Sequence, residues 1–495
     1  MFWGTVFLLL SNIYVKGLGF CYRVFLMRVF GAEGMGLIEM AMPIFTFMLV
    51  ISGWGVSLGL SKKLAESGGC AQKGASLLKN ALFLLVLFGL VVSCAALLFS
   101  PFIAKHLAPD ERILPYLRVL IPAVLIIAVA SPFRGFFQGL QQVGNLGAAQ
   151  AIEQSVRFCC GIYLAYKMTS LAIEQTVTAA ALASVAGEAA GLIFLLAAFT
   201  HYRRKQPVLK AVYSTKVCGE LLAFGTPVTI NRLVSSGILM AQALLIPHCL
   251  QNAGLNVVAA TEAYGRLSGV ALTLLNLPGV FTSALACALL PVVAESYLDK
   301  KRLAARLLPS LQALVICTLP GMAVLFLFAE PLCDGLFHCP LAAEPLRILA
   351  VCGIFEFFSG LLSTVLQGMG QLKALLINNI ISGVCLLTAI VILCSRPAAG
   401  LAGAAISLNI YFIIAFILNC LTFQNKSGLH LPYLKLFFKP LSSVFLALIP
   451  FYLIKNIIFL QEKMAETAIL ACLYLILYFL ILLSLGGLPK FWKRA

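Results

Sequence analysis

The chain has 495 residues, of which 61% are hydrophobic and only 11% are charged, and its mean hydropathy is +1.02. Soluble proteins are about 45–50% apolar and about 25% charged, so this composition excludes a soluble globular protein of this length. The formal net charge of +17 suggests nucleic-acid binding at first sight, but the basic residues are spread over many loops. The apolar runs have the length of about 20 residues that a membrane-spanning helix requires, which excludes the shorter strands of a membrane barrel.

Fourteen apolar segments follow one another, separated by proline, glycine and charged residues. Because only helices satisfy their own backbone hydrogen bonds within hydrocarbon, an all-α polytopic membrane protein with about fourteen transmembrane helices is predicted. The first run, residues 2–30, is too long for a signal peptide and is expected to remain as the first helix. The predicted spans are 3–27, 37–60, 77–104, 114–137, 146–166, 174–200, 217–246, 263–292, 303–330, 342–367, 372–394, 399–423, 437–459 and 466–486.

Lysine and arginine alternate in abundance from one predicted loop to the next. One set of loops holds about 20 of these residues and the alternate set about seven. The positive-inside rule places the richer side and both termini in the cytoplasm. The basic excess is therefore a topology signal, with attraction to anionic lipid headgroups as a further effect, and nucleic-acid binding is not predicted.

Three short sequences recur at one separation of 229 positions. Ala65-Glu66-Ser67 returns at 294–296, Leu117-Arg118 at 346–347 and Gln138-Gly139 at 367–368. This offset predicts two six-helix repeats that run parallel, an architecture in which transporters place their binding site between the halves. The predicted parts are an N-lobe at 1–200, a basic cytoplasmic connector at 201–216, a C-lobe at 217–423, and helices 13 and 14 with a cytoplasmic tail at 424–495.

Four basic residues lie inside or at the ends of predicted spans at the start of each half. Lys16 and Arg23 are seven residues apart and share one face of the first helix, Arg232 lies in the seventh helix, and Arg266 lies in the eighth. A charge at mid-bilayer costs at least about 2.5–3.5 kcal/mol, so such residues face a cavity or a partner. Arginine and lysine bind phosphate oxygens, and these four residues are predicted to hold a pyrophosphate headgroup. The alternative is that Arg23 snorkels to the outer interface and that Arg266 simply flanks a helix end.

Acidic residues in the spans have two alternative roles. Glu153 and Arg157 are four residues apart and are expected to form an ion pair on one helix face. Glu39, Glu188 and Glu356 are either counter-ions to the arginines or sites that couple transport to a proton or sodium ion. The sequence contains no catalytic or metal-binding motif, so neither an enzyme nor a cofactor is predicted.

Several stretches resemble those of a known transporter superfamily. The segments Lys16-Gly-Leu-Gly-Phe-Cys-Tyr-Arg23 and Arg134-Gly-Phe-Phe-Gln-Gly-Leu-Gln141 resemble polysaccharide-export proteins of the stage V sporulation protein B type. The segment Ala263-Tyr-Gly-Arg-Leu267 resembles those proteins and the lipid II flippases. All belong to the multidrug/oligosaccharidyl-lipid/polysaccharide exporter superfamily.

The resemblance implies a two-lobed carrier that works by alternating access. By motif position, Lys16 and Arg266 match cavity cations of the lipid II flippases, whereas Tyr22 occupies the position of their next arginine, and residues 37–60 contain no counterpart of their helix-2 arginine. The resemblance also implies that helices 13 and 14 form part of a groove for the polyprenyl tail.

The function predicted is flipping of an undecaprenyl-linked anionic sugar precursor, either lipid II or another lipid-linked oligosaccharide, from the inner to the outer leaflet of a bacterial cell membrane. The chain is expected to act as a monomer, with coupling to Na⁺, H⁺ or the membrane potential left open. One alternative is a multidrug cation antiporter, which the basic first helix disfavours because a cationic drug needs an acidic cavity. A non-transporting scaffold of cell-wall assembly is the other.

Overall fold

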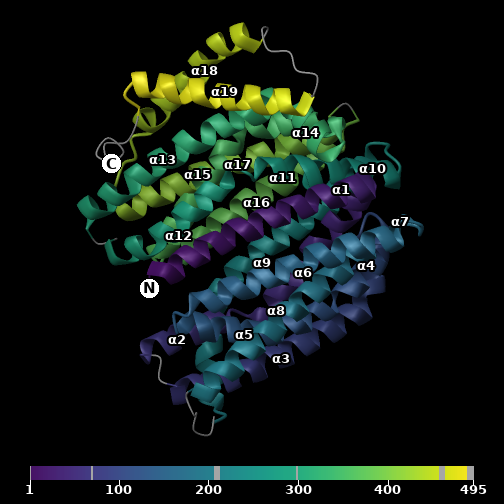
Figure 1. Ribbon diagram of the computed structural model, residues 1–495, viewed down its shortest axis with the longest axis vertical. Coiled ribbons are helices and arrows are strands. Elements are labelled where there is room, and N and C mark those ends of the chain that lie inside the picture. Colours follow the sequence, from purple (N-terminus) through teal and green to yellow (C-terminus); the bar gives the residue numbers. More distant parts are fainter. Residues whose placement is uncertain are drawn as a thin grey trace. The chain divides into compact units, whose positions relative to one another are not determined.

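The computed structural model describes residues 2–68, 71–205, 212–296, 299–397, 399–455 and 463–487, and all regular structure in these ranges is helical (Figure 1). The predicted all-α class is thereby confirmed. Two compact units divide the chain: Met1–Pro247 with Val257–Gly265 forms the first, and His248–Asn256 with Arg266–Ala495 forms the second.

The first unit packs long helices side by side around a core of leucine and phenylalanine. α3, α5, α6 and α8 run alongside one another, and α1 packs on α6 and α10 (Figure 1). Leu60, Phe136 and Leu221 are buried where α2, α5 and α9 meet. The helices are α1 (Phe2–Gly53), α2 (Val56–Glu66), α3 (Ala71–Phe102), α4 (Leu114–Leu120), α5 (Pro122–Gly139), α6 (Val143–Met168), α7 (Ile173–Thr176), α8 (Thr178–Lys205), α9 (Thr215–Asn252, in this unit as far as Pro247) and α10 (Val257–Tyr264), with the short η1 (Ile103–Leu107) and η2 (Glu111–Ile113).

α1 consists of two arms that meet at Gly31. The backbone there has φ 66° and ψ −173°, a conformation open to glycine and strained for other residues. A second break follows at Trp54 and Gly55, where φ is 36° and 62°. The span predicted at 37–60 is therefore interrupted, and its last residues belong to α2 instead.

The second unit contains the elements η3 (Gly265–Ala271, from Arg266 onward), α11 (Leu272–Leu275), α12 (Gly279–Ser296), α13 (Lys300–Leu327), α14 (Ala329–Phe337), η4 (Pro340–Ala342), α15 (Ala343–Gly368), α16 (Leu372–Cys394), α17 (Gly400–Ser427), α18 (Tyr433–Lys455) and α19 (Lys463–Ser484). α15 packs between α13 and α17, while α18 and α19 pack on each other and on α13 (Figure 1). The hydroxyl of Tyr478 in α19 donates a hydrogen bond to the carbonyl oxygen of Ile316 in α13 at 3.1 Å. The two C-terminal helices are thus attached to this unit by both apolar and polar contacts.

Eleven helices among the described residues are long and apolar enough to cross a membrane, and a bent pair with an angle of 58° raises the number to twelve. The bent pair, 257–275 with 279–295, covers the span predicted at 263–292, and the helix breaks at Pro278. Apolar side chains such as Leu98 and Leu434 are 78% and 82% exposed, which suits a surface in contact with lipid.

The predicted count of fourteen exceeds this number for identifiable reasons. Residues 11–53 form one continuous candidate although their 43 residues would extend about 65 Å, roughly twice the bilayer core. α6 has 26 residues but carries Glu153, Arg157 and Lys167, and it is not among the candidate spans.

The division into units does not follow the predicted lobe boundary at 201–216. The structure groups α9 up to Pro247, and α10, with the helices of the first unit. Residues 206–211 of the predicted connector and 488–495 of the predicted tail lie outside the described residues. The repeat-based lobes stay a prediction about the sequence halves, whereas the units describe packing.

Candidate functional site

The kink in α1 brings two of the predicted site residues together. Arg23 in the first arm and Glu39 in the second form an ion pair with 3.0 Å between Nη2 and Oε1. In a straight helix their Cα atoms would be about 24 Å apart, so the pair depends on the change of direction at Gly31. Glu39 is buried, with a side chain only 11% exposed, whereas 42% of the Arg23 side chain is exposed. The pair therefore has a protected acidic side and an accessible basic side.

Lys16 and Arg232 lie at exposed positions of the first unit, in α1 and α9 respectively. Near Lys16, the hydroxyls of Tyr14 and Ser155 lie 2.8 Å apart and connect the first arm of α1 to α6. The helix arm that carries Lys16 and Arg23 is therefore attached to α6 by a hydrogen bond. Lys16 and Arg23 both lie within the candidate span 11–53.

A closed network of four charged side chains joins α5, α6 and α8. Nη2 of Arg134 donates to Glu153 at 3.0 Å and to Glu188 at 3.2 Å. Nη2 of Arg157 donates to the same two carboxylates at 2.9 and 3.1 Å. Each carboxylate therefore accepts from both guanidinium groups, and the network as a whole carries no net charge.

The four side chains of this network are largely buried in the first unit. The side chains of Glu153 and Glu188 are each 11% exposed, and those of Arg134 and Arg157 are 31% and 20% exposed. The Nε atoms of both arginines are buried without a hydrogen-bond partner among the described residues. A cluster of this kind depends on all four members, because loss of one leaves a buried charge uncompensated.

The network includes Arg134, which was not among the predicted site residues. The ion pair expected between Glu153 and Arg157 is present, and Glu188 contacts arginines as one of its two alternative roles requires. Arg134 completes the network from α5. Its position inside the apolar run 122–139 was a signal that it needed a buried partner.

Glu356 in α15 has a different environment. It is partly buried, and within the described ranges it forms neither an ion pair nor a hydrogen bond. Both of its predicted roles, as a counter-ion and as a coupling site, stay predictions.

Arg266 follows directly after a point of backbone contact between α10 and α1. A Cβ atom on Gly265 would lie 2.0 Å from the carbonyl oxygen of Ala32, and one on Gly36 would lie 2.1 Å from the carbonyl oxygen of Thr261. Only glycine permits such an approach. Arg266 then lies in the π-helical segment η3, a geometry frequent at functional sites, and is partly buried.

A polar cluster surrounds the same contact. The Thr261 hydroxyl donates to Oδ2 of Asp110 at 2.9 Å, and Nη2 of Arg112 donates to the same atom at 2.7 Å. Arg112 also contacts Glu33, which lies just beyond the kink in α1. Asp110 is 3% exposed. The cluster positions the end of α10, and with it the start of the segment that carries Arg266.

Comparison with known proteins gives two family matches and several relatives. Residues 2–297 match the family described as polysaccharide biosynthesis protein, and residues 267–391 match the family MatE. Stage V sporulation protein B of Bacillus subtilis (strain 168) is 31% identical over 433 residues, covering 85% of this chain and 82% of that protein. The lipid II flippase MurJ of the same organism is 21% identical over 462 residues, covering 86% and 82%.

A solved structure of a lipid II flippase MurJ in an inward closed conformation has a TM-score of 0.73 to this chain at 14% identity. The superposition covers 96% of this chain and 98% of that one. At this identity the likeness concerns the fold, which the two chains share over nearly their whole length.

Proposed function

We propose a function on the premise that this chain belongs to the family of polysaccharide biosynthesis proteins. The resemblance predicted from the sequence is confirmed by that membership. The chain is a multi-pass membrane protein of a transporter superfamily, related to stage V sporulation protein B and to the lipid II flippase MurJ.

Within this family, the chain acts as a flippase for an undecaprenyl-linked anionic sugar precursor, either lipid II or another lipid-linked oligosaccharide. The observation that carries the proposal is the basic face of the first arm of α1. Lys16 and Arg23 lie seven residues apart within a candidate span, and residues 1–28 contain no acidic side chain. Such a face suits a phosphate-bearing headgroup, whereas the polyprenyl tail suits lipid.

The ion pair between Arg23 and Glu39 holds the Arg23 guanidinium in place for the headgroup. A phosphate oxygen binds the exposed side of this group while Glu39 stays paired with it, because a guanidinium has five N–H donors. The approach requires no large desolvation step, because 42% of the Arg23 side chain is exposed and the buried Glu39 keeps its counter-ion. Arg232 and Arg266 stay predicted members of the headgroup site.

The proposed topology has fourteen crossings, with both termini in the cytoplasm of a bacterial cell. The two arms of α1 count as two crossings, the bent pair as one, and α6 as another. In α6, Glu153 and Arg157 are compensated by the four-residue network, and Lys167 lies in the last turn. The sequence halves rock about the headgroup site in a monomer. Glu356 is the proposed site of coupling to H⁺ or Na⁺ if transport is ion-driven.

The test is translocation of a defined lipid-linked precursor in proteoliposomes. Lys16→Ala and Arg266→Ala are each expected to lower the initial rate at least tenfold while leaving the amount of reconstituted protein unchanged. Lys301→Ala, an exposed cation at the start of α13, is the matched control and retains the wild-type rate. Wild-type rates in both site variants would exclude the cationic headgroup site.

The match of residues 267–391 to the MatE family favours one other function, that of a multidrug cation antiporter. A cationic drug requires an acidic site, and the exposed Lys16 and Arg23 oppose it electrostatically. Drug efflux from cells that express the chain, with no precursor translocation in proteoliposomes, would support the antiporter instead.

A further inference from the structure

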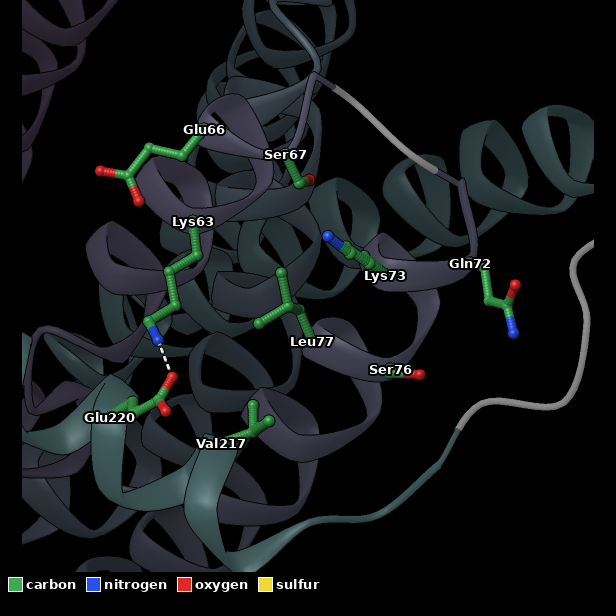
Figure 2. Close-up of a pocket in the computed structure, with 9 residues that line it drawn as sticks. All are labelled: Lys63, Glu66, Ser67, Gln72, Lys73, Ser76, Leu77, Val217 and Glu220. Atoms are coloured by element: carbon green, nitrogen blue, oxygen red, sulfur yellow. Dashed lines mark hydrogen bonds and ion pairs between the residues drawn. The ribbon is translucent and has the colours of Figure 1, made fainter.

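A groove of about 700 Å³ lies where α2, α3 and α9 meet in the first unit (Figure 2). Its volume is within the range of small-ligand sites, which is about 300–1,000 Å³. Most of its lining side chains are charged or carry hydrogen-bonding groups, and only two are aliphatic. They are Lys63, Glu66, Ser67, Gln72, Lys73, Ser76, Leu77, Val217 and Glu220.

The basic side chains of the groove differ in their partners. Lys63 forms an ion pair with Glu220, and Lys62 beside the groove lies 3.8 Å from Glu66. Lys73 has no ion-pair partner among the described residues, and Figure 2 shows its amino group directed toward the space between α2 and α3. The two lysines and two glutamates that line the groove sum to zero, and Lys62 beside it adds one positive charge at neutral pH. An anion is therefore favoured at Lys73, the lining cation without an ion-pair partner among the described residues.

The walls of the groove are held in place independently of these charges. A Cβ atom on Gly225 in α9 would lie 2.2 Å from the carbonyl oxygen of Trp54, so the two backbones are in direct contact. On the other side, the amide of Asn80 in α3 donates to the carbonyl oxygen of Val212 at 3.0 Å and accepts from the Ser214 amide at 2.9 Å. These contacts hold the walls of the groove by backbone packing and by hydrogen bonds outside the charged residues.

We propose that this groove binds a phosphate-bearing headgroup, with Lys73 as its permanent cation and Lys63 as an exchangeable one. Phosphate oxygens compete with Glu220 for Lys63, because that carboxylate is 44% exposed and the pair is weakened by water. The inference rests on the proposed function in one respect, the side of the membrane. In that function the groove lies on the cytoplasmic side, where the precursor is collected. Inorganic phosphate compounds and phospholipid headgroups share this chemistry.

Two substitutions that replace a charged side chain with a neutral one of similar size should change the affinity for inorganic pyrophosphate in opposite directions. Lys73→Gln removes the unpaired cation and is expected to weaken binding of inorganic pyrophosphate about three- to tenfold. Glu220→Gln releases Lys63 and is expected to strengthen binding by a similar factor. Lys301→Gln in the second unit is the control and should leave the affinity unchanged. Binding is measured by calorimetric titration of the full chain in detergent at low salt, with melting temperature as the check on folding.

A second arm distinguishes the sources of the phosphate. The same variants are placed in nanodiscs of phosphatidylcholine with added phosphatidylglycerol, and retention of phosphatidylglycerol is measured by native mass spectrometry. Retention that falls in Lys73→Gln identifies a lipid headgroup, whereas a change confined to pyrophosphate identifies a soluble phosphate compound. Affinities in both folded variants that equal those of Lys301→Gln would overturn the proposal. Neither arm depends on transport, so a failure here is separate from failure of the flippase proposal.

Discussion

The four-residue network in the first unit makes a quantitative prediction about stability. Glu188→Gln removes the carboxylate that accepts from Arg134 at 3.2 Å and from Arg157 at 3.1 Å. The two guanidinium groups then share one carboxylate, and the network carries one uncompensated positive charge. Breaking a buried ion pair costs about 3–5 kcal/mol, and because the arginines are 20–31% exposed we expect a cost of about 2–4 kcal/mol.

The assay is equilibrium unfolding of the purified protein in mixed micelles. Glu330→Gln is the matched control, because Glu330 pairs with Arg347 at 3.5 Å with both side chains 46% or more exposed, and such a pair contributes about 0–1 kcal/mol. The double variant Glu188→Gln with Arg134→Gln restores neutrality and should lose less stability than the sum of its single changes. Equal costs for Glu188→Gln and Glu330→Gln, or full additivity in the double variant, would refute the reasoning.

Two further predictions concern packing and buried polar groups. Gly36→Ala should lower the free energy of unfolding by about 1–3 kcal/mol, because its new methyl group would lie 2.1 Å from the Thr261 carbonyl oxygen, whereas Gly360→Ala meets no atom within 4 Å and should be neutral or stabilising. A similar cost for both would exclude the close contact of α1 with α10. Asn419→Ala should cost about 1–3 kcal/mol in the same unfolding assay, because the buried Asn419 amide donates to Ser359 at 2.8 Å and accepts from Asn378 at 2.9 Å. An unchanged unfolding midpoint would show that this network in the second unit adds no stability.

The predictions that the structure confirms most directly depend on the composition of single spans and on short separations along the chain. The composition identified a helical membrane protein, because the requirement for apolar residues is a property of each span by itself. The ion pair of Glu153 with Arg157 followed from a separation of four residues, which the helix period places on one face. Glycine and proline lie at two of the breaks, at Gly55 and Pro278.

Contacts between helices required the tertiary structure. Arg134 reaches Glu188 across 54 positions, and Lys63 reaches Glu220 across 157. The pairing of Arg23 with Glu39 depends on one backbone conformation at Gly31. The sequence by itself determined which side chains are costly to place in a membrane. Packing alone decided their partners, because the choice of partner depends on how helices cross and bend, and no spacing along the chain encodes that.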